Sequence, residues 1–301
     1  MNRLRYLAQS LPKVVFGRGR ACPSCGSARS TAVDRKFVIT TLRRCAKCKL
    51  LFRSPTTSAI ESEEFYEKKY TQGFTTEVPS EKDLQRLIDT NFRSTTKDYS
   101  LYLSLLAALW VRPGAQLLDF GCSWGYGASQ LGRAGFRVKG FEISQSRCSY
   151  ARKKLDVDAT SNIAELEGSY DCFFSAHVIE HVPSPSDTIM LARRLLRPGG
   201  LFVAFTPNGC LARRERDYHG WHHHWGFVHP QLIDAEFFIE AVSPDVFLVA
   251  SNPYEVRAIS QWDSVQSLRL DLSGDELMLA FRTRNRTFGA SHEHPIRSSD
   301  G

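Results

Sequence analysis

The segment AQLLDFGCSWGYGASQLGRAG at 115–135 constrains the fold of this chain more than any other. Gln116–Phe120 is a short apolar run typical of a buried strand, and Asp119 lies near its end. Gly121 and Gly125 follow, and glycines there allow tight turns and a close approach of a ligand to the backbone. A helix is expected to begin at about residue 128. Strand, glycine turn and helix in this order predict one βα unit of a parallel sheet.

A second strand is expected at 136–144, about 20 residues further on, with Glu142 near its end. A carboxylate at that position can accept hydrogen bonds from both hydroxyls of a ribose. Ser123 replaces the middle glycine of a GxGxG pattern, and the compact GxGxxG that suits a pyrophosphate is absent from this segment of the sequence. The looser pattern favours S-adenosylmethionine (SAM), which lacks phosphate and has a charged amino-acid tail. NAD or FAD is the alternative.

The alternation of elements continues downstream. A buried strand is expected at 170–175, a loop with His177-Val178-Ile179-Glu180-His181 follows, and an amphipathic helix and LRPGG lead to another buried strand at 201–206. The last two strands, at 245–251 and 275–284, are expected to form an antiparallel pair. The sequence therefore predicts an α/β fold, a Rossmann-like sheet with helices on both faces.

Together, DFGCxxGxG after a strand, an acidic residue closing the next strand, HVIEHVxxP and LLRPGGxxxxxxPN resemble the class I SAM-dependent methyltransferases. The resemblance implies a SAM site in which the glycine loop holds the methionine portion, Glu142 the ribose and residues 159–162 the adenine. The residues expected to bind the cofactor are Asp119, Gly121, Ser123, Gly125, Glu142, Ala159, Thr160 and His177.

Two CxxC pairs near the N-terminus, CPSCG and CAKCKLLF, are separated by 19 residues. Each pair reads as a tight turn with two thiolates pointing the same way, and a strand is expected at 36–44 between them. Two such turns predict a closed, structural four-cysteine zinc site. Its ligands are Cys22, Cys25, Cys45 and Cys48. The ribbon followed by FYEKKY resembles a bacterial methyltransferase subgroup associated with surface glycans, sugar nucleotides and natural products.

Charge divides the chain unevenly. Residues 1–57 contain 13 Lys or Arg and one acid, Asp34, which gives +12 and leaves −5 for the remainder of a chain with net charge +7. Such a module can attract phosphates, including nucleic acid, or can dock on the acidic catalytic part. The expected organisation is a basic zinc ribbon at 1–57, a helical linker or cap at 58–110, the methyltransferase domain at 111–285 and a flexible tail at 286–301.

No apolar run in the sequence approaches the roughly 20 residues that span a bilayer, and the first residues do not resemble a signal peptide. We therefore expect a cytoplasmic protein without a membrane span.

His177, Glu180 and His181 lie at i, i+3 and i+4 and would share one face of a helical turn. GWHHHWGFVHPQLI at 220–233 places His224 in a pattern H-x-x-F-x-x-P. The set resembles the divalent-metal site of small-RNA 3′-end and ubiquinone-pathway O-methyltransferases. Three roles stay open: a general base, a second divalent metal held by His177, Glu180, His181 and His224, or an ordered loop without chemistry. In the following loop, Arg213, Arg214 and Arg216 are candidates for binding a phosphate or carboxylate.

The sequence thus predicts transfer of the SAM methyl group to a hydroxyl of a small polar acceptor, first a sugar nucleotide or glycan. An RNA methyltransferase that uses the basic ribbon for binding is the alternative enzyme. A non-catalytic binding module with a SAM-type fold is the alternative outside the enzymes.

Overall fold

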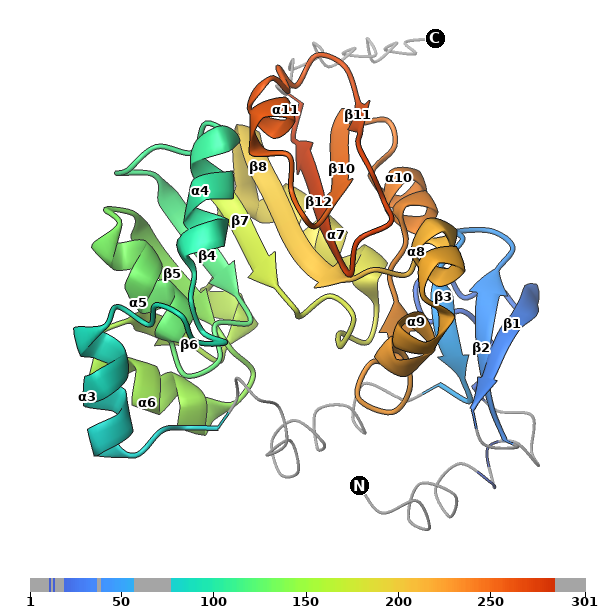
Figure 1. Cartoon of the computed structure of the whole chain (residues 1–301), viewed down its shortest axis with the longest axis horizontal. Coiled ribbons are helices and arrows are strands. Elements are labelled where there is room, and N and C mark those ends of the chain that lie inside the picture. The colour runs from blue at the N-terminus through green and yellow to red at the C-terminus, as the bar shows by residue number, and fades with distance from the viewer. Residues whose placement is uncertain (1–10, 12, 14–18, 37–38, 57–76, 285–301) are drawn as a thin grey trace, which may run out of the picture.

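The computed structural model describes residues 11, 13, 19–36, 39–56 and 77–284, and its main feature is an eight-stranded sheet (Figure 1). The strand order is β11-β10-β12-β8-β7-β4-β5-β6. From β6 to β8 neighbouring strands are parallel, and β12 runs antiparallel to both β8 and β10. The strands are β4 (Gln116–Phe120), β5 (Arg137–Phe141), β6 (Asp158–Thr160), β7 (Tyr170–Ala176), β8 (Leu196–Pro207), β10 (Phe247–Ser251), β11 (Leu268–Arg269) and β12 (Glu276–Arg282). The predicted Rossmann-like sheet with its antiparallel last pair is confirmed.

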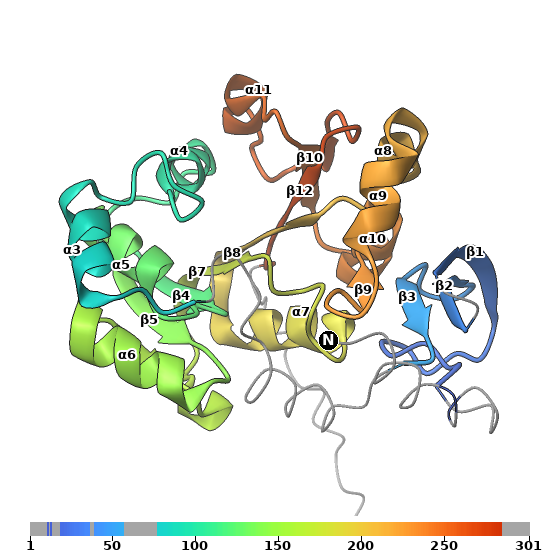
Figure 2. The ribbon, with the colours of Figure 1, turned by 60° about the horizontal axis from the view of Figure 1, so that its bottom comes forward.

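Helices cover both faces of this sheet, as Figure 2 shows from a second side. One apolar cluster joins the sheet to α4 (Ser100–Ala108), α5 (Tyr126–Arg133) and α11 (Val256–Ser260), and another joins it to α7 (Pro185–Leu195) and α10 (Ala235–Val242). Adjacent residues of a strand serve opposite faces: Phe202 belongs to the second cluster and Val203 to the first. The strands are therefore apolar on both sides, as parallel strands between helix layers must be.

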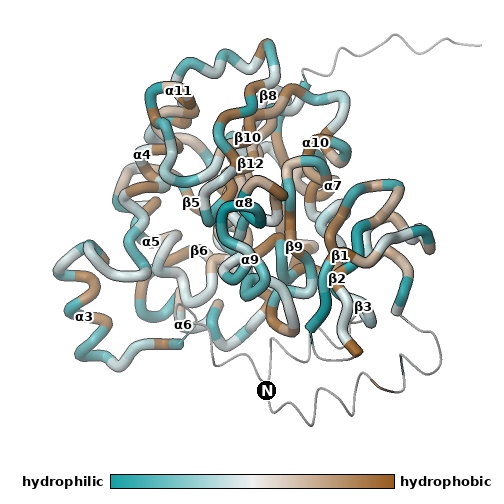
Figure 3. The backbone as a smooth tube through the Cα atoms, turned by 45° about the vertical axis from the view of Figure 1, so that its right-hand side comes forward, coloured by the Kyte–Doolittle hydropathy of each residue, from teal (hydrophilic) through white to brown (hydrophobic). Residues whose placement is uncertain are grey.

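The other described helices are shorter or lie further from the centre of this sheet. Two of them, α8 and α9, lie beside the strands that the N-terminal residues form (Figure 1). Figure 3 shows that the hydrophobic backbone segments gather in the central strands while α8 and α9 are largely hydrophilic. The bounds are α3 (Glu81–Asp89), α6 (Gln145–Leu155), the 3-10 turn η1 (Ile163–Glu165), α8 (Leu211–Arg216) and α9 (Tyr218–His224).

A second sheet contains the N-terminal strands β1 (Ser30–Lys36), β2 (Thr40–Cys45) and β3 (Leu51–Ser54) in the order β1-β2-β3-β9. Its fourth strand, β9 (Gln231–Leu232), comes from the far end of the sequence. The strand predicted at 36–44 corresponds to β2, which begins later, at Thr40, and the sequence did not predict β1, which pairs with β2 in antiparallel fashion. The N-terminal module is thus completed by a strand from the catalytic part of the chain.

Strand β8 also begins earlier than predicted, at Leu196 instead of after the LRPGG segment. Gly199 N donates to Thr283 O and Thr283 N donates to Gly200 O, so pairing with the chain after β12 keeps this segment extended. Within the predicted cap at 58–110 the structure describes α3 and α4, while 57–76 and the predicted tail at 286–301 lie outside the described residues. Across the described part of the chain, every helix is too short or too polar to span a bilayer.

Candidate functional site

The glycine loop after β4 surrounds a buried carboxylate. Asp119 is 1% exposed, and its Oδ2 has no hydrogen-bond partner among the described residues. Burial, with the negative charge of Glu142 added, raises the pKa of Asp119 to about 7. A buried acceptor atom without a donor is costly. The position is therefore suited to a ligand that carries a cationic or hydrogen-bonding group.

Backbone conformation explains which residues form this loop. Gly121 and Gly125 have φ of 89° and 90°, and a Cβ at Gly121 would lie 2.2 Å from Val178 Cγ2. Ser123 takes φ of 51°, in the left-handed region that its glycine counterpart would occupy without strain. Ser123 N donates to Glu142 Oε2 at 3.1 Å, which ties the loop to the next strand. The serine therefore keeps a glycine-like turn.

Glu142 follows β5 and is 8% exposed. Besides Ser123 N, its carboxylate accepts a hydrogen bond from Ser144 N at 3.0 Å, and Arg147 Nη1 lies 3.8 Å from Oε1. Glu142 N in turn donates to Thr160 O in β6, so the predicted adenine-side residues Ala159 and Thr160 stand next to it at the same sheet edge. The glycine turn with positive φ at residues 121 and 125 and the Asp119 oxygen that has no hydrogen bond among the described residues both fit SAM.

His177 follows β7 with φ of 56° and reaches across the sheet edge to the start of β12. Its Nε2 lies 2.6 Å from Glu276 Oε2 and its Nδ1 lies 3.7 Å from Glu180 Oε1. Burial lowers the pKa of His177, but its contacts with the two glutamates outweigh burial and raise the pKa to about 10. The two glutamates therefore favour the imidazolium form of His177. With 47% of its side chain exposed, it is accessible to a ligand.

Glu276 was not predicted as a site residue. Tyr254 Oη donates to Oε1 at 2.7 Å, and Tyr102 Oη donates to Oε2 at 3.1 Å, the oxygen that His177 also contacts. Burial raises the pKa of both tyrosines, so both are hydroxyl donors. Tyr102 comes from α4 and Tyr254 from the segment after β10. No short-range pattern links residues 174 and 22 positions apart, so only the fold reveals this cluster.

A third group lies beside it. Glu180, His181 and His229 offer ligand atoms that all lie within 4.8 Å of one another. Glu180 is 1% exposed, accepts from Thr206 Oγ1 at 3.0 Å through Oε2, and has no hydrogen-bond partner for Oε1 among the described residues. Burial raises the pKa of Glu180, but His177 and the other histidines outweigh it and lower that pKa to about 2. Burial lowers the pKa of His181 to about 4, so a carboxylate faces neutral His181.

Backbone carbonyls orient both rings of this group. His181 Nδ1 lies 2.8 Å from Val228 O, and His229 Nδ1 lies 2.6 Å from His224 O. Both Nδ1 atoms act as donors in these contacts, because a carbonyl oxygen can only accept. Such carbonyl contacts are the usual way in which metal-ligating histidines are held.

Of the predicted set of His177, Glu180, His181 and His224, the structure brings Glu180 and His181 together in one possible metal-ligand group, which includes neither His177 nor His224. The structure places His229 beside Glu180 and His181, whereas His224 contributes its backbone carbonyl to orient His229. The pattern H-x-x-F-x-x-P selects His224, and it carries no signal for His229 five positions later in the same loop.

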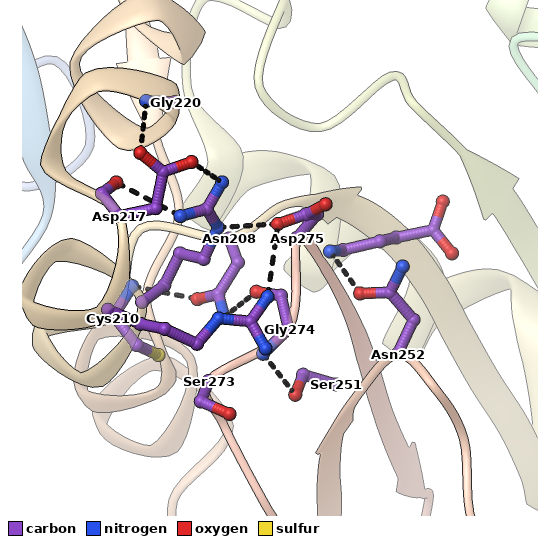
Figure 4. A network of polar contacts seen from close by, with 12 residues as sticks. Asn208, Cys210, Asp217, Gly220, Ser251, Asn252, Ser273, Gly274 and Asp275 are labelled. Carbon is purple, nitrogen blue, oxygen red and sulfur yellow. Dashed lines mark hydrogen bonds and ion pairs between the residues drawn. The ribbon is translucent and has the colours of Figure 1, made fainter.

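The arginines of the α8 segment differ from the expectation too. Arg213 is 4% exposed, and its guanidinium contacts Asp217 Oδ2 at 2.9 Å and Asp275 Oδ1 at 2.7 Å. Arg214 lies over Tyr218 and Trp221 instead of in a cleft. Figure 4 shows this network of polar contacts, in which the side chains of Asp217 and Asp275 come together from different elements. Arg213 therefore joins α8 to the start of α9 and to the turn before β12, and its guanidinium is not available to an acceptor.

The four N-terminal cysteines converge on one point. Cys22 Sγ lies 3.5 Å from Cys48 Sγ, Cys25 Sγ lies 3.5 Å from Cys45 Sγ, and all four sulfurs lie within 4.8 Å of one another. Tetrahedral zinc with Zn–S bonds of about 2.3 Å separates its sulfurs by about 3.8 Å. The donor set and its spacing fit a structural zinc ion. The other four cysteines, Cys122, Cys148, Cys172 and Cys210, are buried singly.

The sheet order, the positive-φ glycine turn after β4 and the acidic residues at the strand ends define a class I SAM-dependent methyltransferase domain. Residues 92–243, which are 152 of the 301, match the sequence model of the methyltransferase domain family. The chain belongs to this family.

Individual relatives agree with that class. A ubiquinone biosynthesis O-methyltransferase from Xanthomonas oryzae pv. oryzae is 30% identical over 156 residues, 43% of this chain and 65% of the relative. A probable SAM-dependent methyltransferase from Mycolicibacterium smegmatis is 34% identical over 109 residues, 35% of this chain and 42% of the relative. The chain thus spans less than two thirds of the length of either protein. Magnesium protoporphyrin IX methyltransferase from Synechocystis PCC 6803, solved with bound SAM, gives a TM-score of 0.46 at 16% identity, covering 76% of this chain and all of that one.

Proposed function

We propose that this chain transfers the methyl group of SAM to a hydroxyl of a small polar acceptor, with a sugar nucleotide or glycan as the first choice. One observation carries the proposal. The glycine turn that follows Asp119 and the polar group around His177 lie at the same edge of one sheet, because β4 and β7 are adjacent parallel strands. A methyl donor and an acceptor bound there would meet at the carboxyl ends of these strands, where such folds bind ligands.

Different residues of the chain would bind SAM and the acceptor. Asp119, Gly121, Ser123, Gly125, Glu142, Ala159 and Thr160 would hold SAM, which supplies an electrophilic methyl carbon. His177 has Nε2 against Glu276 and Nδ1 near Glu180, and its raised pKa would make it a cationic neighbour of the acceptor and a poor base. His181 is neutral and is the better candidate for a base. Methyl transfer depends mainly on in-line positioning, which these fixed side chains favour.

A second candidate mechanism is favoured by the group of Glu180, His181 and His229. A divalent cation held there would polarise the acceptor hydroxyl. Its support is the ligand spacing within 4.8 Å and the position of Glu180 Oε1, which has no hydrogen bond among the described residues and lies 3.7 Å from both His177 Nδ1 and His181 Nε2. One carboxylate and two imidazoles are a common ligand set for divalent metals.

The decisive experiment supplies labelled SAM and the purified chain to separate fractions of sugar nucleotides, glycans and RNA. Label should enter a sugar-containing fraction as an O-methyl group. Label in RNA alone would favour the alternative RNA methyltransferase, and SAM binding without transfer to any fraction would favour a non-catalytic module.

The metal and base mechanisms are separated by three matched variants. If a cation is bound, His229→Ala should abolish Mg²⁺- or Mn²⁺-dependent activity as fully as His181→Ala, while His224→Ala should keep it, because residue 224 contributes only its backbone carbonyl. If His181 is a base alone, only His181→Ala should lower turnover, by about 10²–10⁴. SAM affinity, measured by calorimetry, should stay unchanged in all three variants. Equal activity in the three variants would contradict both mechanisms.

A further inference from the structure

The basic ribbon is fastened to the acceptor loop, defined here as residues 217–232, through its one acidic residue. Asp34 in β1 accepts hydrogen bonds from Trp225 Nε1 at 3.0 Å and Tyr218 Oη at 3.0 Å, and its Oδ2 lies 2.6 Å from His222 Nδ1. Its side chain is 7% exposed. Burial raises the pKa of Asp34, but the donors of the loop and of Arg35 N outweigh burial and lower that pKa. One buried carboxylate thus gathers three side chains of a loop that is 184 or more residues away in sequence.

Apolar packing reinforces this attachment. Leu42 and Leu51 of the ribbon form a cluster with Trp221, Trp225 and Leu232 of the loop, and each of the five is at most 1% exposed. A tryptophan buries a large apolar surface and needs a partner for its N–H. The carboxylate of Asp34 satisfies Trp225, and Gly209 O satisfies Trp221. The attachment therefore combines a core with complete hydrogen bonding of its two indoles.

Backbone contacts fix the register between ribbon and loop. β3 pairs with β9 in antiparallel fashion, with Leu51 opposite Leu232 and Phe52 opposite Gln231, and Arg53 N donates to Pro230 O at 2.8 Å. Lys36 Nζ also donates to the carbonyl of Trp225. Strand pairing permits only discrete registers. The ribbon therefore fixes the backbone at Trp225, before the 226–230 segment, and at Gln231 and Leu232, after it.

The segment held in this way carries His229. Its main-chain oxygen accepts from Gly226 N at 2.9 Å, and its ring lies 4.7 Å from that of His181. Gln231 N donates to Glu180 O, so the loop meets the HVIEH turn directly after His229. The contacts lead without a break from Asp34 through Trp225 and the 224–229 turn to the group of Glu180, His181 and His229.

We propose that the zinc ribbon is a positioning element of the acceptor site and that Asp34 is its positioning residue. Asp34 orders the acceptor loop and thereby places His229 against Glu180 and His181. The role given to His229 rests on the proposed function, whereas the ordering of the loop does not. Lys36 and Arg44 support docking within the chain, since Lys36 contacts Trp225, and Arg44 lies 3.1 Å from Asp234 Oδ2 and 2.6 Å from Glu236 Oε2.

The test is amide hydrogen exchange on the full, zinc-loaded chain. Asp34→Ala should raise exchange over residues 217–232 by about tenfold or more, because local opening becomes easier when charge-assisted hydrogen bonds are lost. Asp34→Asn keeps one acceptor oxygen, and its exchange rate over residues 217–232 should lie between those of the wild type and Asp34→Ala. Arg35→Ala is the matched control, since Arg35 is the exposed neighbour in β1. The β4–β8 strands should exchange as in the wild type in all variants.

Mn²⁺ titration followed by paramagnetic resonance gives a second readout of the positioning. Asp34→Ala should weaken Mn²⁺ binding to the Glu180, His181 and His229 group while zinc content and SAM affinity stay unchanged. Unchanged exchange over 217–232 in a zinc-loaded Asp34→Ala protein would overturn the inference, as would faster exchange accompanied by wild-type Mn²⁺ affinity. If the wild type binds no Mn²⁺, the metal mechanism of the proposed function fails, and the exchange result alone decides whether Asp34 orders the loop.

Discussion

Two carboxylates at the cofactor edge differ in how the protein satisfies them. Glu142 receives two backbone N–H groups and has Arg147 nearby, whereas Asp119 is buried with an unpartnered oxygen among the described residues. The Glu142 carboxylate therefore orders the loop, and the Asp119 carboxylate can still accept a hydrogen bond from a ligand. Their chemical roles follow from these surroundings, since both are acidic residues at the ends of adjacent parallel strands.

Glu142→Ala tests the organising role. The alanine variant loses the carboxylate that accepts from Ser123 N and Ser144 N and that is expected to accept from the ribose hydroxyls. SAM affinity should fall by about 10- to 100-fold, since a hydrogen bond to a charged group contributes roughly 1.5–3 kcal/mol. Calorimetric titration with SAM measures the change, and Glu167→Ala, at an exposed position in the following segment, is the control. Unchanged SAM affinity in Glu142→Ala, or tighter binding of NAD than of SAM by the wild type, would contradict the assignment.

Asp119 gives a prediction about pH. Its pKa of about 7 in the folded chain exceeds the ordinary 3.8, so the folded state binds more protons than the unfolded state between these values. Stability without SAM should therefore fall as pH rises from about 4 to 7. Asp119→Asn removes this dependence, and the Tm of the variant relative to wild type should increase across that window, by the equivalent of at most about 4 kcal/mol. Thermal unfolding at several pH values measures it, and a pH-independent difference would refute it.

At the scale of elements, the turn before β12 places Glu276. Asn208, at the end of β8, donates from Nδ2 to Leu272 O and Gly274 O, both at 2.8 Å, and accepts from Cys210 N (Figure 4). Gly274 N donates to Ser251 Oγ. One buried asparagine thus connects the end of β8, the start of α8 and the turn that leads to Glu276.

Gly274→Ala should disturb this turn, because a Cβ there would lie 1.6 Å from Asn252 O. Overpacking against backbone costs about 1–3 kcal/mol, and we expect Tm to fall accordingly. Gly132→Ala is the matched control: it lies in α5, a Cβ there would have nothing within 4 Å, and alanine in a helix is more favourable by roughly 1 kcal/mol. Thermal unfolding of both variants decides, and a Gly274→Ala protein as stable as wild type would show that the turn can shift.

Elements with a local signal could be predicted, and contacts between distant elements could not. Apolar runs at 116–120 and 170–175 gave strands close to β4 and β7 because burial between two helix layers leaves a continuous hydrophobic stretch. The β3–β9 pairing, Glu276 and the position of His229 depend on contacts between residues that lie far apart in the sequence. Glu276 is the first residue of β12, whose sequence has no feature that marks a site. Its place in the site follows only from its contacts with Tyr102, Tyr254 and His177.

At the scale of the whole molecule, the ribbon and the catalytic part share one core. The apolar cluster that contains Cys22, Cys45 and Phe52 of the ribbon also contains Ile233 and Phe237 of the catalytic part. The sequence suggests two units, a ribbon at 1–57 and a domain from 111, but a shared core and a shared sheet couple their unfolding. Cooperative unfolding is expected wherever neither part keeps its contacts alone.

Calorimetry should therefore show one unfolding transition for the zinc-loaded chain, with metal analysis giving about one zinc per chain. Cys25→Ser, or removal of zinc by a chelator, should lower the Tm of that single transition by more than about 5 °C, because 1 kcal/mol corresponds to roughly 2–4 °C in a domain of this size and a structural zinc contributes several kcal/mol. Chelator added to Cys25→Ser serves as the control and should change nothing further, since the ligand set is already incomplete. Two transitions, with the upper one insensitive to zinc, would show that the ribbon folds apart from the catalytic domain and that the shared core contributes little.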